Sequence, residues 1–586
     1  MTTLRPRFSK QVSSPAAPSA GRGVFLVVIA IVFSGIASHS LWTPDEPVGA
    51  AIGRAMLESR DGVVPRLNGA PFLEKPPLYW WVQVPFLRVF GLSAGSARLP
   101  SALFSCLTLF VTYRLGRRIG GPRAGMVSLL VLGTTALFAE DASRAVVDPA
   151  LMLFVTLTHS GFVVFADPRG PAERRRGAWT IGVASALAFL SKGWIALALG
   201  VLPPTLYLVF RHRRRGLRSL GELPWIALPL FAFLATPWVV ALWWKMGWSA
   251  VGESLFSNLF GRFLATNAGR VYGHRQPFWY YLPAIAFMLL PWSLTLPGLF
   301  RRAQARRNEE PEGKGSGLLL FTFSIGVVVL SLAASKRELY LLPLLPAFAI
   351  SVAGWLEETR RLDGAGDPWS RRLHAAIAYG GSLVLLLFAV LAFSAPWIVR
   401  NRWPGLSAVD SLSTAWLVAS GILALALGSW LLWTWFRASS PEASPLSPEA
   451  LALPFAVVFL LAQTTAKAWV EPLKSLGDMI GAVAKTLPGE MPVPFFASPR
   501  APSESVIGII QFNLGRRVLL LASPREVEGF FARHPGSGVL FRVQDLRTLP
   551  PGLRRHLIPV YDETGRKASP FAIATWSRRA LEADRP

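Results

Sequence analysis

Hydrophobic residues recur along this chain in long runs separated by short polar segments, from Val24 to about Lys467. A run of roughly 17–25 predominantly apolar residues is long enough to cross a bilayer as a helix. We expect about thirteen such helices, at residues 24–41, 97–114, 124–140, 149–166, 178–191, 194–210, 224–243, 278–298, 317–334, 339–356, 373–397, 413–436 and 449–467. The pattern predicts a mainly α-helical, polytopic membrane protein.

The pattern changes after the last run. Residues 468–586 are about the size of a small domain and alternate between helical and strand-like spacing of apolar residues. Helices are predicted at 473–487, at 505–514 and from 523 onward, and strands at 493–497, 518–522, 539–543 and 557–561. Ser523 and Glu526 have the spacing of a capping box at a helix start. We therefore expect a small C-terminal α/β domain.

The composition supports a membrane protein and its charges predict the orientation. Hydrophobic residues make up 52% of the chain and charged residues 16%, whereas soluble chains carry about a quarter charged residues. The formal net charge of +26 is concentrated in arginine clusters between alternate hydrophobic runs: Arg114–Arg123, Arg174–Arg176, Arg211–Arg218, Arg301–Arg307 and Arg360–Arg372. The positive-inside rule places these clusters and the tail 1–23 in the cytoplasm. The basic charge thus gives no indication of a nucleic acid partner.

This orientation divides the chain into three parts. The transmembrane part, 24–467, has outer segments at 42–96, 140–148, 244–277 and 335–340. An odd number of helices that starts inside leaves residues 468–586 on the periplasmic side. The only cysteine, Cys106, lies in a predicted helix and excludes an intrachain disulfide. Charged groups held close to a bilayer are costly and often functional, so the outer segments are the place to look for chemistry.

The first outer segment begins with adjacent carboxylates, Asp45 and Glu46. Thr43, Pro44 and Glu46 have the spacing of an N-cap, a first helical residue and a capping-box partner, which favours a capping role for Glu46. Asp45 lies outside that box, where the chain leaves the membrane, and capping and catalysis suit it equally well. Apolar residues at helical spacing over 48–56 predict a short amphipathic helix lying on the membrane surface.

The same segment contains Glu74-Lys75-Pro76-Pro77. Pro76 disfavours a helical backbone at Lys75, so the ammonium is presented in a fixed direction, and a lysine at the headgroup level is a ready phosphate contact. The alternative is a lysine that simply extends to the interface. The two prolines favour phosphate binding.

The other outer segments add further candidates. Asp148 precedes Pro149 at a predicted helix start, which suits an N-cap and does not exclude a function. Cationic and phenolic groups that can coordinate an anionic headgroup interrupt two hydrophobic runs at Lys336, Arg337 and Tyr340.

The long polar segment 244–277 contains Arg262 and His274. A lone histidine in such a segment is usually a surface residue. The sequence has no His/Cys cluster with metal-ligand spacing, no nucleotide phosphate loop and no Ser-His-Asp order.

Eight blocks, in order along roughly the first 350 residues, carry a family resemblance: Asp45-Glu46, Val64–Gly69, Glu74–Leu78, Ala142–Asp148, Leu190–Gly193, Asn258–Phe263, His274–Tyr281 and Ser335–Pro343. Together they resemble the bacterial lipid A aminoarabinose transferases and the wider family of protein O-mannosyltransferases with the GT-C fold. Thirteen helices and an external C-terminal domain match the layout of the aminoarabinose enzymes.

The resemblance implies a glycosyltransferase of the bacterial inner membrane that takes a sugar from a polyprenyl-phosphate donor, with inversion. It implies that Asp45 is the catalytic carboxylate and that Asp148 is a second acidic residue of the site. By the same likeness, the donor phosphate is held by Lys75, Arg262 and Tyr340. Cations on a leaving phosphate and a base for a hydroxyl acceptor agree with this chemistry.

The predicted substrate-binding set is completed by Glu46, Glu74, His274 and Lys336. The acceptor stays open between lipid A, another glycolipid, a cell-wall glycan and a protein. Relatives often have histidine where this chain has Leu259, in a region near a bound zinc and the residue matching Glu74. Because leucine does not bind metal, no zinc site of that kind is expected. No cofactor is predicted, and dependence on a divalent cation is left open.

Two other classes of protein fit the hydrophobic pattern. A transporter or flippase of a lipid-linked saccharide would place ionisable residues near the midplane and often shows internal repeats, whereas here the ionisable residues gather in outer segments and no repeat is seen. A membrane-anchored binding protein would leave the charged outer segments without a role.

Overall fold

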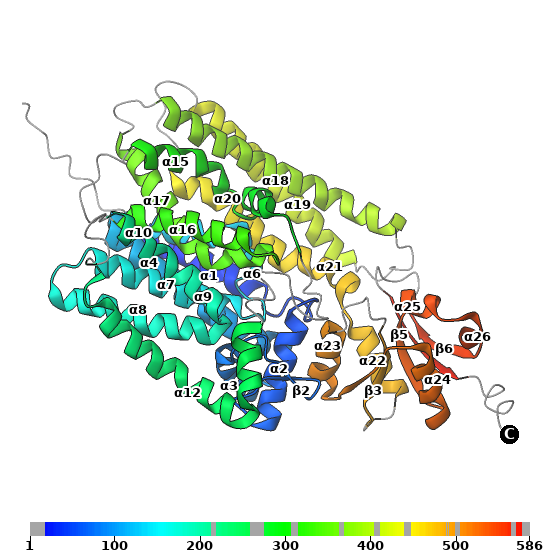
Figure 1. The fold of residues 1–586 in the computed structure, drawn as a ribbon. Helices are drawn as coiled ribbons and strands as arrows, with labels where there is room; N and C mark the ends of the chain where they lie inside the picture. The colour runs from blue at the N-terminus through cyan, green and yellow to red at the C-terminus, as the bar shows by residue number, and fades with distance from the viewer. Residues whose placement is uncertain are drawn as a thin grey trace, which may run out of the picture.

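The computed structural model describes residues 18–211, 218, 220–257, 275–305, 315–362, 368–402, 411–438, 447–487, 489, 491–497, 504–563 and 570–576. The described chain is mainly helical, in agreement with the prediction (Figure 1). The helices of the bundle are α1 (Pro18–Ser34), α4 (Ala94–Gly120), α5 (Pro122–Gly133), α6 (Ala136–Asp141), α7 (Asp148–Ala166), α8 (Pro171–Lys192), α9 (Trp194–Gly200), α10 (Leu202–Arg211), α12 (Leu223–Gly252), α14 (Tyr281–Met288), α15 (Leu296–Ala305), α16 (Gly315–Leu332), α17 (Leu345–Leu362), α18 (Pro368–Arg402), α19 (Ser411–Ala438) and α20 (Pro448–Leu461).

The bundle has the dimensions of a multi-pass membrane protein. Within the described ranges, eight helices are long and apolar enough to cross a membrane, and nine if the bent pair Phe278–Met288 and Trp292–Gln304 forms one span. Shorter apolar helices occur at Phe25–Ser34, Pro122–Gly133 and Gly317–Leu332. The number thirteen stays a prediction.

The first outer segment folds into α2 (Glu46–Ser59), a hairpin of β1 (Arg66–Leu67) and β2 (Ala70–Pro71), and α3 (Leu78–Phe90). The hairpin turns at Asn68 and Gly69, whose φ angles of 56° and 80° are those that an Asn-Gly turn accommodates. The helix expected over 48–56 is present as part of α2. Its expected place on a membrane surface is wrong, because its apolar face is buried in a core shared with α3 and α23 (Glu504–Leu514).

The C-terminal region contains a five-stranded sheet of order β4-β3-β5-β7-β6, in which β3 is parallel to both neighbours and β7 is antiparallel to both neighbours. The strands are β3 (Val493–Phe496), β4 (Val518–Leu521), β5 (Gly538–Arg542), β6 (Leu557–Asp562) and β7 (Phe571–Trp576). The helices are α21 (Lys467–Lys474), α22 (Gly477–Thr486), α23, α24 (Pro524–Arg533), α25 (Val543–Thr548) and α26 (Pro551–Arg555).

Two details of this region differ from the sequence prediction. The helix expected over 473–487 is divided, because Ser475 has an extended backbone that ends α21. Strand β7 was not expected, and it lies between β5 and β6 in the antiparallel part of the sheet. The predicted cap of α24 is present, with the Ser523 hydroxyl accepting a hydrogen bond from the Glu526 backbone N–H.

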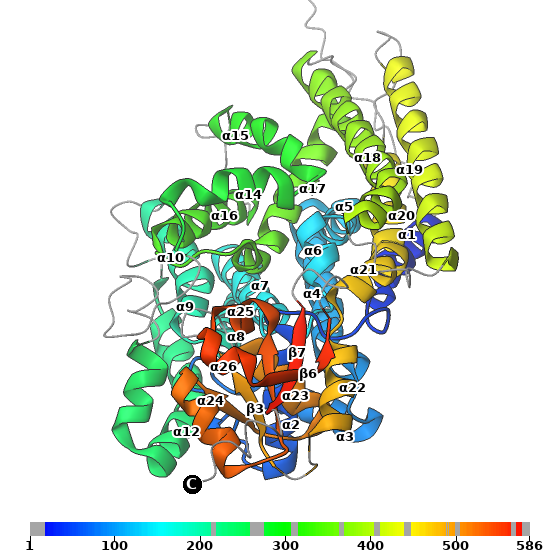
Figure 2. The ribbon, with the colours of Figure 1, turned by 90° about the vertical axis from the view of Figure 1, so that its right-hand side faces the viewer.

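The C-terminal region packs directly on the first outer segment, and both lie at one end of the bundle (Figures 1 and 2). Asn68 at the hairpin tip exchanges two hydrogen bonds of 2.7 and 2.9 Å with the backbone of Val518 in β4. Its own N–H donates to Gln511 Oε1 of α23 at 2.7 Å. These hydrogen bonds join the two regions, whose buried apolar residues also belong to one hydrophobic core.

A second connection reaches the chain just before α2. The carboxylate of Glu471 in α21 accepts hydrogen bonds from the Ser40 backbone N–H at 3.0 Å and from the Trp42 indole at 2.7 Å. The segment that leads into α2 is thereby held from the C-terminal side.

The closeness of α23 to α2 generates a stability prediction. A Cβ added at Gly508 would lie 2.7 Å from the carbonyl carbon of Pro47, so Gly508→Ala should force the two helices apart and cost about 1–3 kcal/mol. The matched control is Gly481→Ala in α22, where a Cβ meets nothing within 4 Å. There the loss of backbone freedom should be neutral or stabilise by about 0.5–1 kcal/mol.

The measurement is the thermal unfolding midpoint of both purified variants, together with protease susceptibility of the C-terminal region. Equal midpoints for the two variants would show that the contact between α2 and α23 is not tight.

Candidate active site

The start of the first outer segment is fixed by a buried ion pair between Glu46 and Arg98 of α4. Both side chains are 1% exposed, and Arg98 Nε lies 2.7 Å from Glu46 Oε1. Glu46 also accepts backbone N–H bonds from Trp42 and Ala145, each at 3.0 Å. The remaining donors of Arg98 reach the carbonyl groups of Ile36, His39 and Ser40. Burial alone would raise the pKa of Glu46, but the hydrogen bonds and charge of Arg98 outweigh it and lower that pKa to about 2.

This geometry corrects the capping expectation for Glu46, while its place in the predicted substrate-binding set stays a prediction. The helix does not begin at Thr43 with a capping box, because α2 begins at Glu46 itself and Asp45 occupies the N-cap position without a side-chain cap. The buried guanidinium of Arg98 takes the carboxylate instead. Glu46 thus ties the outer segment to α4 and to the chain before α7, and its position does not favour a contact with substrate.

The neighbouring carboxylate, Asp45, meets a different set of cations. Arg337 donates two hydrogen bonds to it, one of them at 2.8 Å to Oδ1, and Arg144 Nη2 lies 3.7 Å from Oδ2. Burial would raise the pKa of Asp45, but the hydrogen bonds and charge of Arg337, with Lys75 and Arg144, lower it to about 2. Asp45 is therefore an ionised carboxylate held in a fixed orientation and still 21% exposed.

Asp148 forms a third ionic contact. It is the first residue of α7 and makes no side-chain cap, so the predicted N-cap role is wrong. Its Oδ1 accepts a hydrogen bond of 2.5 Å from Lys192 Nζ at the end of α8. The same ammonium lies 4.4 Å from the centre of the Tyr340 ring, which brings α7, α8 and the segment at 335–340 together.

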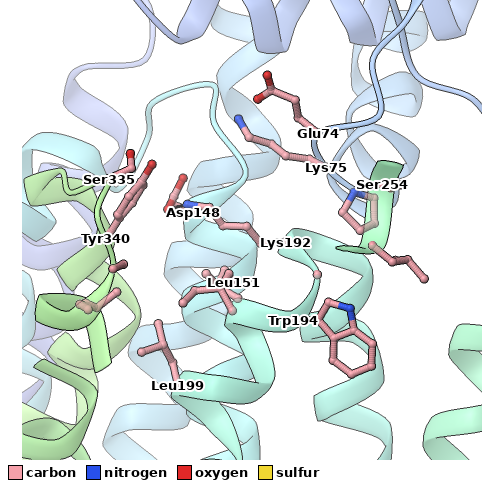
Figure 3. Close-up of a pocket in the computed structure, with 16 residues that line it drawn as sticks. Glu74, Lys75, Asp148, Leu151, Lys192, Trp194, Leu199, Ser254, Ser335 and Tyr340 are labelled. Atoms are coloured by element: carbon pink, nitrogen blue, oxygen red, sulfur yellow. Dashed lines mark hydrogen bonds and ion pairs between the residues drawn. The ribbon is translucent and has the colours of Figure 1, made fainter. Parts of the chain in front are cut away.

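These residues border a cleft with about 810 Å³ of empty space, part of it open to solvent. Its polar end is formed by Glu74, Lys75, Asp148, Lys192, Ser335 and Tyr340 (Figure 3). Its deeper wall is apolar and consists of Leu151, Trp194, Ile195, Leu199, Leu255 and Leu330. A cavity with cations at one end and a hydrocarbon-like wall suits an amphipathic molecule with an anionic head.

The predicted residues divide into four groups in the structure. Asp45 and Glu46 form the ion pairs described above and are not lining residues of the cleft. Glu74, Lys75, Asp148 and Tyr340 line the cleft. Lys336 is 3% exposed and donates to the backbone carbonyls of Ala333 and Gln276 at 2.5 and 3.0 Å. Its ammonium therefore stabilises the local backbone conformation. Arg262 and His274 lie outside the described residues, as does Leu259.

Sequence reasoning missed two cations of the site, and it assigned a third, Arg337, to an anionic headgroup and not to Asp45. Lys192 and Arg144 were seen only as parts of motifs, although Lys192 contacts Asp148 and Arg144 contacts Asp45. Arg337 was noted beside Lys336, but nothing in an extended dipeptide says which side chain faces the site. Among the described residues, no group of three His, Cys, Asp or Glu side chains could hold a metal ion.

Comparison with known proteins agrees with this architecture. Residues 74–244 match the family model of dolichyl-phosphate-mannose-protein mannosyltransferase. The chain is 26% identical over 548 residues to an undecaprenyl phosphate-alpha-4-amino-4-deoxy-L-arabinose arabinosyl transferase of Pseudomonas fluorescens, covering 89% of this chain and 88% of that protein. It is 29% identical to the enzyme of that name from Edwardsiella ictaluri, over 62% of this chain and 63% of the relative.

A solved structure gives the same fold. The crystal structure of ArnT from Cupriavidus metallidurans bound to undecaprenyl phosphate superposes with a TM-score of 0.73 at 21% identity, covering 95% of this chain and 98% of that one. The protein is thus a multi-pass membrane glycosyltransferase with the GT-C fold. It is similar to the aminoarabinose transferases along most of its length and to the protein mannosyltransferases over residues 74–244, and it is a multi-pass protein of the bacterial inner membrane.

The buried pair generates a stability prediction. Glu46→Gln leaves Arg98 charged and without its counterion in the interior, which should cost about 3–5 kcal/mol and lower the thermal unfolding midpoint sharply. The control in the same helix is Glu58→Gln, because Glu58 is 51% exposed in its pair with Arg54 and such pairs contribute about 0–1 kcal/mol. A midpoint for Glu46→Gln close to that of Glu58→Gln would contradict the assigned role.

The pair of Asp45 with Arg337 generates a pH prediction. Because the pKa of Asp45 is lowered to about 2, its ion pair stabilises the fold above the ordinary pKa of an aspartate, near 4, and this contribution is lost as the pH falls through about 2. In Arg337→Gln the effect of burial prevails, so the pKa of Asp45 should rise. The acidic limb of the pH–activity profile should then move to higher pH, and an unmoved limb would show that Arg337 does not set it.

Proposed function

We propose that this enzyme transfers a sugar from an undecaprenyl-phosphate-type donor to lipid A on the periplasmic side of the membrane. The observation that carries the proposal is the amphipathic cleft, whose apolar wall suits a polyprenyl chain and whose polar end has Lys75 and Lys192 for a phosphate. Relatives at 26–29% identity are named for an undecaprenyl phosphate aminoarabinose donor, which supports the same donor class here.

The chemistry is a single displacement at the anomeric carbon. An acceptor oxygen forms a bond to the anomeric carbon. At the same time the bond between this carbon and the donor phosphate oxygen breaks, and its electron pair leaves with the phosphate. Lys75, Lys192 and the Tyr340 hydroxyl lie at the polar end where the developing charge must be stabilised. From the family likeness, Arg262 adds a further cation, and Asp148 holds Lys192 in place.

The charge state of Asp45 supports a phosphate as the acceptor. A carboxylate whose pKa is about 2 is a weak general base near neutral pH, because an effective base has a pKa near the working pH. A hydroxyl acceptor would require a base, whereas a lipid A phosphate is already ionised. Asp45 then holds Arg144 and Arg337, whose guanidinium groups orient the acceptor phosphate, and it does not remove a proton.

The membrane topology belongs to the same proposal. Each of the thirteen predicted spans contains helix, although the first is helical only as far as Ser34 and the span at 278–298 is bent. We infer thirteen crossings with the tail 1–23 in the cytoplasm. The C-terminal sheet packs on the segment that carries Asp45, so we place residues 468–586 in the periplasm as a small α/β domain. Experiments must determine whether a protein can act as acceptor and whether the reaction requires a divalent cation.

The test uses purified protein in lipid with radiolabelled polyprenyl-phosphate sugars and a membrane extract as acceptor. Label should enter the lipid A fraction, and Asp45→Asn should reduce the rate by about a hundredfold or more, as for other charged groups aligned with a reacting centre. The control is Asp61→Asn, a carboxylate of the same outer segment that pairs with Lys245 at 2.8 Å and should leave the rate near that of the wild type.

Each other outcome points elsewhere. Label in protein would assign the enzyme to the mannosyltransferase branch of the family. Undiminished transfer by Asp45→Asn would remove Asp45 from the mechanism. No transfer from any donor by folded protein would favour the transporter.

A further inference from the structure

A second polar pocket lies at the opposite end of the bundle from the cleft. It is formed where α4 and α7 end and α8 begins, and Ser160, its first lining residue in α7, lies 12 residues beyond Asp148, or about 18 Å along the helix. Its lining consists of Arg114, Leu115, Arg117, Arg118, Ser160, Val164, Arg169, Glu173, Arg176 and Thr180. The turn between α7 and α8 lies far from the C-terminal sheet (Figure 1).

The pocket has a strong excess of positive charge. Its single carboxylate, Glu173, is taken by Arg118, whose Nη1 lies 2.6 Å from Glu173 Oε1. For the other four guanidinium groups, Arg114, Arg117, Arg169 and Arg176, no carboxylate of the described residues lies within 4.0 Å. Four like charges gathered in one concave site repel one another, so the site favours an anionic occupant.

Orientation by the positive-inside rule does not explain this arrangement by itself. Other arginines at the same end of the bundle have partners: Arg123 pairs with Glu357, Arg302 with Glu358 and Arg175 with Glu222. The rule needs cations in these connections, but it needs no pocket and no lack of counterions. The concentration of unmatched charge in one hollow is therefore a separate observation.

The surroundings of the pocket match a lipid headgroup. Leu115 and Val164 contribute apolar surface, and the hydroxyl groups of Ser160 and Thr180 lie in the wall. Trp179, which precedes Thr180 near the start of the predicted span 178–191, is 60% exposed. An exposed tryptophan at the end of a membrane helix is typical of the interface between headgroups and acyl chains. Basic pockets between membrane helices at this level bind anionic headgroups.

We propose that this pocket binds an anionic phospholipid of the inner leaflet whose headgroup has two phosphates. The cations come from two sides, Arg114, Arg117 and Arg118 from α4 and Arg169 and Arg176 from the α7–α8 turn and α8. Two phosphates joined by a short linker meet both sides at once, whereas a single phosphate meets one. The site is separate from the donor cleft and does not depend on the proposed reaction, but its assignment to the inner leaflet rests on the proposed membrane orientation.

The experiment compares lipid retention by the full-length protein in detergent, measured by native mass spectrometry with added diphosphatidylglycerol. The pocket variant is Arg114→Gln with Arg176→Gln, and the control is Arg175→Gln with Arg218→Gln, two exposed arginines of the same end that do not line the pocket. Wild type and control should retain the lipid equally. The pocket variant should retain it on the order of tenfold more weakly, from the loss of two interfacial arginines.

Two further arms identify the source of the phosphate. Phosphatidylglycerol, with one phosphate, should bind more weakly than diphosphatidylglycerol, and pyrophosphate at equal concentration should not displace the lipid. Displacement by pyrophosphate would indicate that the pocket binds a soluble polyphosphate and not a lipid, and it would overturn the proposal. Equal retention by the pocket variant, or an equal loss in the control, would also overturn it.

A measurement on the unaltered protein covers the case in which the pocket variant fails to fold. A photoreactive diphosphatidylglycerol should label the wild-type chain within residues 114–118 or 160–180. Labelling confined to other parts of the chain would exclude the pocket as the lipid site.

Discussion

The buried pair of Glu46 with Arg98 is the constraint on which the reactive end of this protein depends. A guanidinium with 1% exposure is tolerated inside a protein only when every donor is satisfied. Arg98 achieves this by collecting the carboxylate of Glu46 and the carbonyl groups at the end of the first span. The chain that enters the first outer segment therefore has one position, and Asp45 inherits that position because it is the adjacent residue.

Adjacent residues with like charge are used for opposite purposes at two places in the site. Glu46 faces the interior and Asp45 faces the cations of the site, while Lys336 bonds to backbone carbonyls and Arg337 bonds to Asp45. In each dipeptide one residue fixes the position of the backbone, and this orients the side chain of its neighbour toward the site. This division explains how an exposed carboxylate can be held in a fixed direction by a short segment without regular structure.

The sequence was sufficient for the parts of the molecule that depend on local pattern. Hydrophobic runs predicted the helical bundle, the turn chemistry of Ser523 predicted the cap of α24, and motif order identified residues that the structure gathers at one cleft, such as Lys75 and Tyr340. It failed where a side chain had to choose between partners distant in the chain. Arg98 and Lys192 carry no local signal of pairing with Glu46 and Asp148. Likewise, a membrane face for α2 was expected because α23, which covers it, lies more than 400 residues further on.

The hydrogen bonds of Asn68 with Val518 have a consequence for the assembly of the enzyme. The two residues are separated by 450 positions. The hairpin is therefore synthesised early, and most of the remaining chain must be synthesised before strand β4 can pair with it. Contacts of such long range form late and slowly. The first outer segment is consequently among the last parts of the protein to acquire its final structure. A bundle already inserted in the membrane becomes an active enzyme only when the C-terminal region has folded against this segment.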